Sequence, residues 1–378
     1  MRKVLADDFS GAAEIAGVGF RYAMAAAVSL ENEGSPGAEL SVVDLDSRSK
    51  SQADAVRLIE SVLNEQWVFK KIDSALRGHV LAELQPFLRS GRYARALVVA
   101  FNPDLGRTIK DGAYRIHGRP ISQTAFRDDP EYPALTSDVT EILHADPGTI
   151  KICRLSDRLP DRGIVIGEGE TSEDLHAWAA RIDESTLPAG GAPFFAAWLE
   201  SRGRRANLCS KVETASENGS KAGSSPTVLV ISGTTSRVVD WRGIRRGSAV
   251  RVLPMPAAVF EAGCGVDETG WPDDVVGTLD DCGFAVASIG ERPLLERSHS
   301  PRLLRHLADL AALVLERRPV YQLWLEGGAT AAAVVRALGW KRLDVVAELA
   351  PGVVRLRPAS GGPFITVKPG SYPWMVEV

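Results

Sequence analysis

Short apolar runs rich in β-branched residues alternate along most of the chain with segments in which apolar residues recur at helical spacing. The runs fit buried strands, and apolar positions three or four residues apart fit helices that pack on a sheet. This alternation is typical of βαβ units and predicts an α/β protein with mostly parallel strands. In the first part, the expected strands are residues 3–6, 41–45, 67–72, 94–101 and 163–168, the expected helices are 11–26, 53–65 and 79–90, and a hairpin is expected over 110–121.

A segment near the middle of the chain, residues 211–226, interrupts the alternation. It is rich in serine, glycine and charged residues and has almost no large apolar side chains, as linkers do. At 378 residues, the chain is also longer than a single hydrophobic core usually supports. We therefore expect two three-layer α/β/α domains with mostly parallel sheets, over residues 1–215 and 226–378, and an active-site cleft between them. In the second part, strands are expected at 226–233, 249–255, 284–290, 322–328, 353–357 and 364–370, and helices at 236–247, 301–318 and 330–339.

The composition narrows the range of functions. Apolar residues make up 45% and charged residues 24% of the chain, and the formal net charge is -4, so no basic surface for nucleic acid is expected. No run of about 18 apolar residues would span a membrane, and no apolar signal-peptide region follows the N-terminus. The four cysteines form no CxxC pair, which favours reduced thiols. We expect a cytoplasmic protein with small-molecule partners, and the composition leaves a monomer and a homodimer both open.

Two adjacent carboxylates, Asp7 and Asp8, directly follow the first expected strand. In an open α/β sheet, ligands bind at the carboxyl ends of the strands. Carboxylates there can accept hydrogen bonds from a polyol, take a proton from a hydroxyl group or contact Mg²⁺. The alternative is that one of the two only caps the helix that begins near Gly11.

Basic and hydroxyl side chains crowd the end of the strand that begins at Trp67. Lysine and arginine beside a hydroxyl suit a small carboxylate ligand, because the guanidinium fork matches a carboxylate in a bidentate way. The alternative is that Asp73 and Arg77, four residues apart, form only a surface ion pair. This cluster consists of Lys70, Lys71, Asp73, Ser74, Arg77 and Gly78.

A third polar cluster lies between glycines after the strand that ends near Phe101. It extends the polar side chains available at the same edge of the sheet, and the alternative is a plain turn. Its members are Arg107, Thr108, Lys110 and Asp111.

Six motifs, in this order and spacing, resemble the motif series of the four-carbon acid sugar kinase family: ADDFSGAAEIAG, KKIDSALRGH, GRTIKDG, SGTTS, EGGATAAAV and KPGSY. The resemblance covers essentially the whole chain. It implies ATP-dependent phosphorylation of threonate, erythronate or 3-oxo-tetronate, with an N-terminal domain for the sugar acid and a C-terminal domain for the nucleotide. The substrate-binding residues expected from it and from the clusters are Asp7, Asp8, Ser10, Lys71, Asp73, Ser74, Arg77, Gly78, Arg107 and Asp111.

Three glycine-containing turns in the second part suit phosphate groups. The backbone N–H groups of a strand-to-helix turn and the positive end of the following helix attract phosphate oxygens, and Lys368 adds a point charge. No Walker loop and no protein-kinase signature occurs in the sequence. The expected nucleotide-binding residues are Ser232, Gly233, Thr234, Thr235, Ser236, Gly327, Gly328, Ala329, Thr330, Lys368, Gly370 and Ser371.

Together these features predict a kinase that uses ATP and Mg²⁺ to phosphorylate the terminal hydroxyl of a small sugar acid. Arg77 and Lys71 are expected to bind the carboxylate, and Asp8 is expected to accept the hydroxyl proton, with Asp73 as the second choice. Asp8, Asp73 and Arg77 are thus the expected catalytic residues, and no metal ligands are assigned.

Two other classes of protein stay open at this point. A nicotinamide-dependent dehydrogenase could share the fold, but no GxGxxG follows an expected strand. A degenerate kinase that binds a sugar acid or a nucleotide without catalysis is the second, and it is favoured by Ala329, which stands where the family usually has aspartate.

Overall fold

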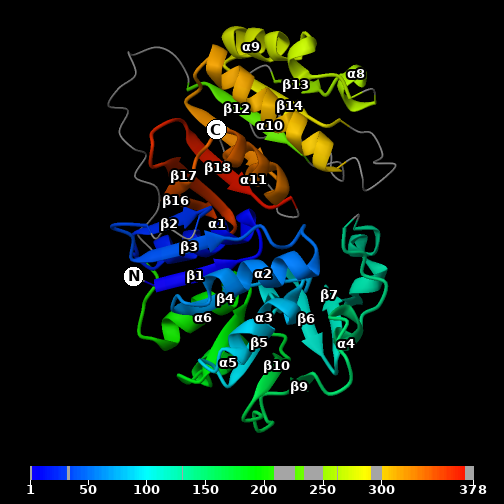
Figure 1. Ribbon diagram of the computed structural model, residues 1–378, viewed down its shortest axis with the longest axis vertical. Coiled ribbons are helices and arrows are strands. Elements are labelled where there is room, and N and C mark those ends of the chain that lie inside the picture. Colours follow the sequence, from blue (N-terminus) through cyan, green and yellow to red (C-terminus); the bar gives the residue numbers. More distant parts are fainter. Residues whose placement is uncertain are drawn as a thin grey trace.

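The computed structural model describes residues 2–31, 35–129, 131–207, 226–233, 250–261, 263–290 and 300–370. It is an α/β protein with one large, mixed and mostly parallel sheet (Figure 1). In sheet order, the strands are β13 (Arg251–Pro254), β14 (Phe284–Ser288), β12 (Val228–Ser232), β15 (Gln322–Glu326), β18 (Phe364–Lys368), β17 (Val353–Pro358), β16 (Arg342–Ala350), β2 (Ala26–Ser29), β3 (Leu40–Asp44), β1 (Arg2–Ala6), β4 (Trp67–Lys71), β11 (Thr186–Gly190), β5 (Arg95–Val99), β10 (Gly163–Gly167) and β9 (Ile150–Cys153).

The expectation of two separate sheets is wrong, because a short antiparallel pairing joins the two parts of the chain. β2 pairs with β16 through three residue pairs, Ser29 with Arg342, Val28 with Leu343 and Ala27 with Asp344. Figure 1 shows β16 and β17 lying beside β2 and α1 at the middle of the molecule. The expected linker, residues 211–226, lies outside the described residues except for Pro226.

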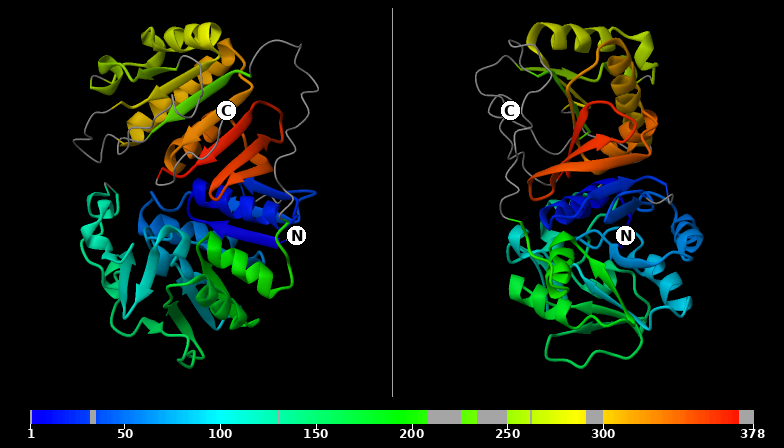
Figure 2. Two further views of the ribbon diagram at one scale, coloured as in Figure 1. Left: turned by 180° about the vertical axis from the view of Figure 1, so that it is seen from behind. Right: turned by 90° about the vertical axis from the view of Figure 1, so that its left-hand side faces the viewer.

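The helices cover the sheet as right-handed crossovers require. α1 and α5 lead to a strand nearer the β13 end of the sheet, from β1 to β2 and from β10 to β11. α2 and α3 lead toward the β9 end, from β3 to β4 and from β4 to β5. Because such crossovers are right-handed, the two pairs of helices lie on opposite faces. Figure 2 shows the helices of the second part packed on its strands. In the described residues, the helices longer than eight residues are α1 (Phe9–Arg21), α2 (Gln52–Val62), α3 (Val80–Arg89), α5 (Ser172–Ala180), α6 (Ala192–Ser201), α9 (Trp271–Cys282), α10 (Ser300–Arg317) and α11 (Gly328–Ala337).

Short elements complete the described part of the chain. The hairpin expected over residues 110–121 is confirmed and belongs to a separate antiparallel sheet of three strands. These elements are β6 (Arg107–Lys110), β7 (Ala113–Ile116), β8 (Arg119–Pro120), α4 (Val139–Ile142), α8 (Ala257–Phe260) and 3-10 turns at Pro103–Leu105, Ile121–Gln123, Ala125–Asp128 and Val266–Glu268.

The first helix is shorter than expected. It ends at Arg21, Ala23 takes a left-handed backbone conformation (φ 56°), and residues 26–29 form β2 instead of continuing the helix. All four β2 residues are buried between β3 and β16, and the apolar environment of the sheet overrides the helical propensity of the alanines. In the part of the chain that the structure describes, no helix combines the length and apolar character needed to cross a bilayer.

The strand order and the sheet twist together determine where the strand ends lie. Six steps separate β1 from β15, and three of them are antiparallel, so β15 would run opposite to β1 in a flat sheet. Twist of about 20–25° per step rotates the strand direction by on the order of 120–150° over this distance. We infer that twist brings the carboxyl ends of the two parts toward the same side.

Candidate functional site

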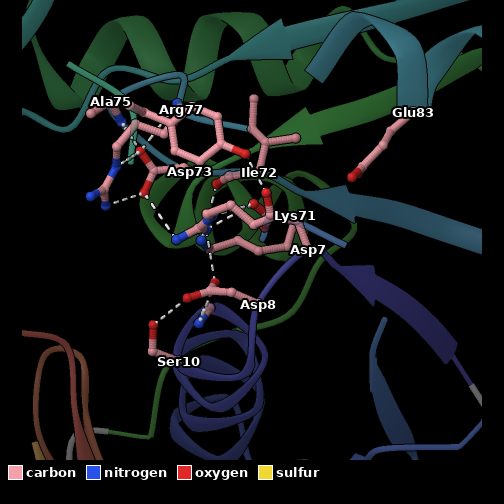
Figure 3. A network of polar contacts seen from close by, with 12 residues as sticks. Asp7, Asp8, Ser10, Lys71, Ile72, Asp73, Ala75, Arg77 and Glu83 are labelled. Carbon is pink, nitrogen blue, oxygen red and sulfur yellow. Dashed lines mark hydrogen bonds and ion pairs between the residues drawn. The ribbon is translucent and has the colours of Figure 1, made fainter. Parts of the chain in front are cut away.

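Asp7 and Asp8 lie where β1 ends and α1 begins, at the edge where β3 and β4 also end (Figure 3). Asp8 is the N-cap residue of α1. Its Oδ1 accepts a hydrogen bond of 3.0 Å from the Gly11 N–H, and its Oδ2 accepts one of 2.6 Å from Ser10 Oγ. The capping alternative is therefore confirmed for Asp8, but each carboxylate oxygen can accept more than one hydrogen bond.

Arg48, which the sequence reasoning missed, connects the aspartates. Its Nε donates to Asp7 Oδ2 (2.8 Å) and its Nη2 to Asp8 Oδ1 (2.9 Å), and its Nη1 lies 3.7 Å from Asp73 Oδ1. The Arg48 side chain is only 14% exposed, so water and salt screen these pairs weakly. Arg48 follows the expected strand 41–45 closely, so the strand-end rule applied to Asp7 and Asp8 would also have found it.

Arg77 and Asp73 form a bidentate pair at the end of β4. Nε and Nη2 of Arg77 donate to the two Asp73 oxygens at 2.9 Å each, and its Nη1 donates to Asp129 Oδ2 at 2.9 Å. The Asp73 side chain is 10% exposed and also accepts from the Ala75 N–H. The ion pair of the alternative interpretation therefore forms, but it is largely buried and not at the surface.

The two lysines of β4 point to different surroundings, as neighbouring strand residues do. Lys70 Nζ forms a fully buried ion pair with Glu83 (2.7 Å), which lies apart from the aspartates in Figure 3. Lys71 Nζ donates to the Ile72 carbonyl (3.0 Å) and lies 3.7 Å from Glu14 Oε2 of α1. Lys71 therefore belongs to the site, whereas Lys70 is structural.

Burial and the two arginines give the aspartates different acidities. Burial raises the pKa of Asp7, whose Oδ1 has no hydrogen-bond partner among the described residues. Burial opposes ionisation of Asp8 too, but Arg48 and other partners outweigh it and lower the pKa of that carboxyl. At Asp73, burial is outweighed by Arg77 and Arg48, which hold the pKa well below its usual range. Asp8 and Asp73 are thus carboxylates at neutral pH.

The turn after β4 has a constrained backbone. Leu76 has a φ of 61° and Gly78 a φ of 92°, both in the left-handed region. A Cβ on Gly78 would lie 3.3 Å from Arg48 Cγ and 3.7 Å from Asp7 Oδ2. Left-handed conformations of bulky residues are uncommon and tend to occur at functional sites.

The third cluster is divided by the structure. Arg107 is 7% exposed and donates from Nη1 to Ser74 Oγ, so these two predicted residues lie together at the ends of β4 and β5. Asp111 lies instead in the exposed turn between β6 and β7, where it pairs with Arg154 (2.7 Å) and its side chain is 61% exposed. The structure therefore brings Arg107 to the site and leaves Asp111 on the surface.

In the second part, polar side chains occupy the ends of three adjacent strands. Ser232, Glu326 and Lys368 are register neighbours on β12, β15 and β18. Ser232 Oγ donates to Glu326 Oε2 (2.7 Å), and Lys368 Nζ lies 2.9 Å from Glu326 Oε1. Glu326 was not among the expected residues, although it stands in the EGGATA motif. Thr234, Thr235, Ser236 and Ser371 lie outside the described residues.

Replacing Lys368 by methionine is expected to lower the free energy of unfolding by about 3–5 kcal/mol, because Glu326 would stay buried without its counter-charge. Both side chains are 1% exposed. Chemical denaturation measures the change. The matched control is Lys341→Met, which removes an ion pair with Glu31 whose side chains are 69% and 40% exposed, and it should cost less than about 1 kcal/mol. Equal losses in the two variants would contradict the prediction.

The start of α11 meets the start of α1. A Cβ placed on Gly328 would lie 2.6 Å from Ser10 Oγ and 2.9 Å from Asp8 Oδ2, so only glycine fits without displacement. Gly327 has a φ of 98°, which favours glycine there as well, and no side chain of the described residues caps the helix. The unpaired N–H groups at the beginning of α11 thus lie beside a carboxylate of the first part.

The neighbours of this turn also have defined places. Thr330 is buried, and a Cβ on Gly233 would overlap its Oγ1, so the turns after β12 and β15 are in contact. Ala329 is exposed. Gly370 is half-buried two residues after β18.

A second link between the two parts joins Asp44, at the end of β3, to α11. Arg336 Nη2 donates to Asp44 Oδ2 (2.9 Å), and its Nη1 lies 3.3 Å from Asp46 Oδ2. The Asp44 side chain is fully buried, and burial raises its pKa to about 7 in spite of Arg336.

Asp44 is expected to make stability fall as pH rises from about 4 to 7. Its folded pKa of about 7 lies above the unfolded value of 3.8, so the folded chain binds the extra proton in this window. Relative to Asp44→Asn, the wild type should lose on the order of 2–4 kcal/mol across it. Denaturant unfolding at a series of pH values measures this loss. Asp161→Asn, which removes a carboxylate whose side chain is 87% exposed, is the control and should keep the wild-type pH dependence. Parallel curves for wild type and Asp44→Asn would contradict the prediction.

Comparison with known proteins agrees with the two-part arrangement of these residues. Residues 3–198 match the family model described as a sugar-binding N-terminal domain, and residues 278–372 match a nucleotide-binding C-terminal domain. The D-threonate kinase of Salmonella typhimurium is 30% identical over 152 residues, which is 37% of this chain and 35% of that protein. The chain thus aligns with about a third of that relative's length.

Other relatives match along the whole chain. The 3-oxo-tetronate kinase of Burkholderia multivorans is 24% identical over 92% of this chain and 89% of its own length. The crystal structure of a Salmonella typhimurium protein superposes with a TM-score of 0.71, at 15% identity, over 98% of this chain and 96% of that one. This last likeness shows a shared fold.

Proposed function

Because the chain belongs to the four-carbon acid sugar kinase family, we propose that it transfers the terminal phosphoryl group of ATP to the terminal hydroxyl of a small sugar acid. Threonate, erythronate and 3-oxo-tetronate are the first candidates. The observation that carries the proposal is the approach of Gly328 to Asp8, since it joins the expected acid-binding and nucleotide-binding residues. In this proposal, residues 1–215 bind the acid, residues 226–378 bind the nucleotide, and the reaction takes place between them.

Asp8 receives the substrate hydroxyl in this mechanism. It is ionised at neutral pH, because its lowered pKa keeps it deprotonated, and it can accept a hydrogen bond from the attacking hydroxyl. A weak base is sufficient for phosphoryl transfer, since the transition state is loose and positioning contributes most of the catalysis. Arg48 keeps Asp8 in place through its hydrogen bond of 2.9 Å.

The turns of the second part bind the phosphates. The uncapped beginning of α11 provides N–H groups and the positive end of a helix dipole, which attract phosphate oxygens. Lys368 and Ser232, both beside Glu326, fix the ends of the neighbouring strands and so the positions of these turns. Phosphate bound at Gly328 would lie next to Asp8.

The described residues do not fit a magnesium site made by the protein alone. Among them, no three or more His, Cys, Asp or Glu side chains are grouped to hold a metal ion. Asp8 and Asp73 already have arginine partners. Mg²⁺ commonly binds nucleotide phosphates and waters with few protein ligands, so we assign it to the nucleotide.

A coupled assay of ADP release over sugar acids of four to six carbons tests the proposal. Turnover is expected with ATP and at least one four-carbon acid, and the product should carry phosphate on its terminal hydroxyl. Ala329 supports a non-catalytic alternative, and thermal stability with ADP separates the two. ADP-dependent stabilisation without turnover on any acid would favour the binding protein, and absence of both would contradict the family assignment of the nucleotide site.

A further inference from the structure

Within the part of the chain that the structure describes, one buried cation at the acid-binding edge has no counter-charge. Arg107, the first residue of β6, is 7% exposed, and among the described residues no carboxylate lies within ion-pair distance of it. A buried charge without a partner is unfavourable, so such a group is well suited to an anionic ligand. The other buried cations of this edge, Arg48, Lys70, Lys71 and Arg77, each have a carboxylate partner.

The surroundings of Arg107 keep water away from one side of it. The ring of Phe126 lies 5.3 Å from the Arg107 guanidinium carbon and 5.6 Å from that of Arg77. An aromatic face over a guanidinium stabilises the charge, and the exclusion of water strengthens any ion pair formed beside it. Arg107 Nη1 donates to Ser74 Oγ, which leaves its other N–H groups for a ligand.

A second polar side chain at this place is unsatisfied. Asn102 and Arg107 are directly opposite in an antiparallel bridge, with hydrogen bonds of 2.9 Å in both directions, so their side chains project to the same face. Asn102 is 4% exposed, and its Oδ1 has no hydrogen-bond partner within the described part of the chain. Since an amide can turn its NH₂ group to where its oxygen lies, Asn102 can donate to a carboxylate.

The beginning of a helix that follows a third strand also lies at this site. β11 lies between β4 and β5, and α6 begins directly after it. A Cβ on Gly191, the N-cap residue of α6, would lie 3.6 Å from Ser74 Cβ, and no side chain in the described ranges caps this helix. The positive end of α6 therefore lies beside Ser74 and favours negative charge there.

We propose that Arg107, Ser74 and Asn102 bind the carboxylate of the substrate. The hydroxyl that Asp8 receives lies at the other end of the substrate. This inference rests on the proposed function and makes it more specific. Arg77 and Lys71, which the sequence suggested for the carboxylate, already have carboxylate partners, so Arg77 is a positioning residue for the turn after β4. The site then selects small polyhydroxy carboxylates and rejects neutral polyols of the same length, which leave Arg107 uncompensated.

Calorimetric titration without nucleotide tests the inference, with D-threonate and D-erythronate as probes and threitol as the neutral match. Arg107→Met is expected to weaken binding of the acid by about 10- to 100-fold. Arg107→Lys should recover part of it, because an ammonium keeps the charge but loses the bidentate fork. Arg115→Met, on the next strand of the same hairpin, is the matched control and should bind as the wild type does.

A measurement on the ligand-free protein separates binding from a structural role. Arg107→Met should melt at or above the wild-type temperature, since it removes an uncompensated buried charge. Acid binding by Arg107→Met within threefold of wild type, or a clear fall in its melting temperature, would overturn the inference.

The kinase proposal can fail separately from this inference. Acid binding that depends on Arg107 without any ADP release would support the carboxylate site and contradict the kinase. If the wild type binds neither acid, both the carboxylate site and the substrate class are contradicted. Thermal stabilisation by ADP then remains the separate test of nucleotide binding.

Discussion

Asp8→Asn is expected to lower kcat for sugar-acid phosphorylation by about 10³-fold while the protein stays folded. The amide oxygen can accept from the Gly11 N–H while the amide NH₂ donates to Ser10 Oγ, so the helix cap is kept. The negative charge that faces the substrate hydroxyl and pairs with Arg48 is lost. Steady-state kinetics with the best acid from the screen, together with a thermal melt, measures both effects.

The control for this variant changes the same residue type at another helix start. Asp54 lies in the first turn of α2, where it pairs with Arg57 and its side chain is 46% exposed. Asp54→Asn should leave kcat within about twofold of wild type and change the melting temperature little. If Asp8→Asn keeps more than a tenth of the wild-type kcat, Asp8 does not receive the hydroxyl, and Asp73 becomes the next residue to test.

Gly328→Ala is expected to lower kcat/KM by about 10²-fold, since a misplacement on the order of 1 Å at reacting groups has this effect. The backbone of Gly328 is helical, so alanine is acceptable there on conformational grounds. Its Cβ would lie 2.6 Å from Ser10 Oγ and 2.9 Å from Asp8 Oδ2, so the Ser10 hydroxyl and the Asp8 carboxylate must shift away from α11. The loss thus comes from separating the two sets of residues, and kinetics at saturating and subsaturating ATP would detect it.

Gly277→Ala is the matched control for this substitution. Gly277 lies within α9 and is exposed, and a Cβ added to it would meet no atom of the described residues within 4 Å. Alanine there should raise stability by about 0.5–1 kcal/mol and leave kcat/KM unchanged. Full activity in Gly328→Ala would show that the close approach to Asp8 has no role in turnover.

Sequence patterns were sufficient where a strand is one continuous apolar run that ends in polar residues. β1, β4, β5 and the strand ends of the second part fit this description, so the edge with Asp8, Lys71 and Asp73 was predicted. β2 and β16 were not, because the alanines of β2 lack an alternating pattern and the burial of β16 does not alternate either. The two strands pair with each other across more than 300 residues of sequence, and no local sequence pattern contains information about this pairing.

The pairing of charges limited how much of the site could be predicted from the sequence. The sequence shows the cations near the acid-binding edge but not which carboxylates neutralise them. Arg77 was expected to bind the substrate carboxylate, with a surface pair to Asp73 as the alternative, whereas the structure pairs it with Asp73 and Asp129. Arg107 was expected to bind the substrate, with a plain turn as the alternative, and it is the buried cation without a carboxylate partner in the described residues.

The short β2–β16 ladder has a consequence for attempts to divide the protein. If the halves were expressed as separate fragments, each would expose a strand edge with unpaired N–H and C=O groups, one along Ala26–Ser29 and one along Arg342–Asp344. Such edges tend to recruit other strands, so the fragments should aggregate alone and become soluble when mixed.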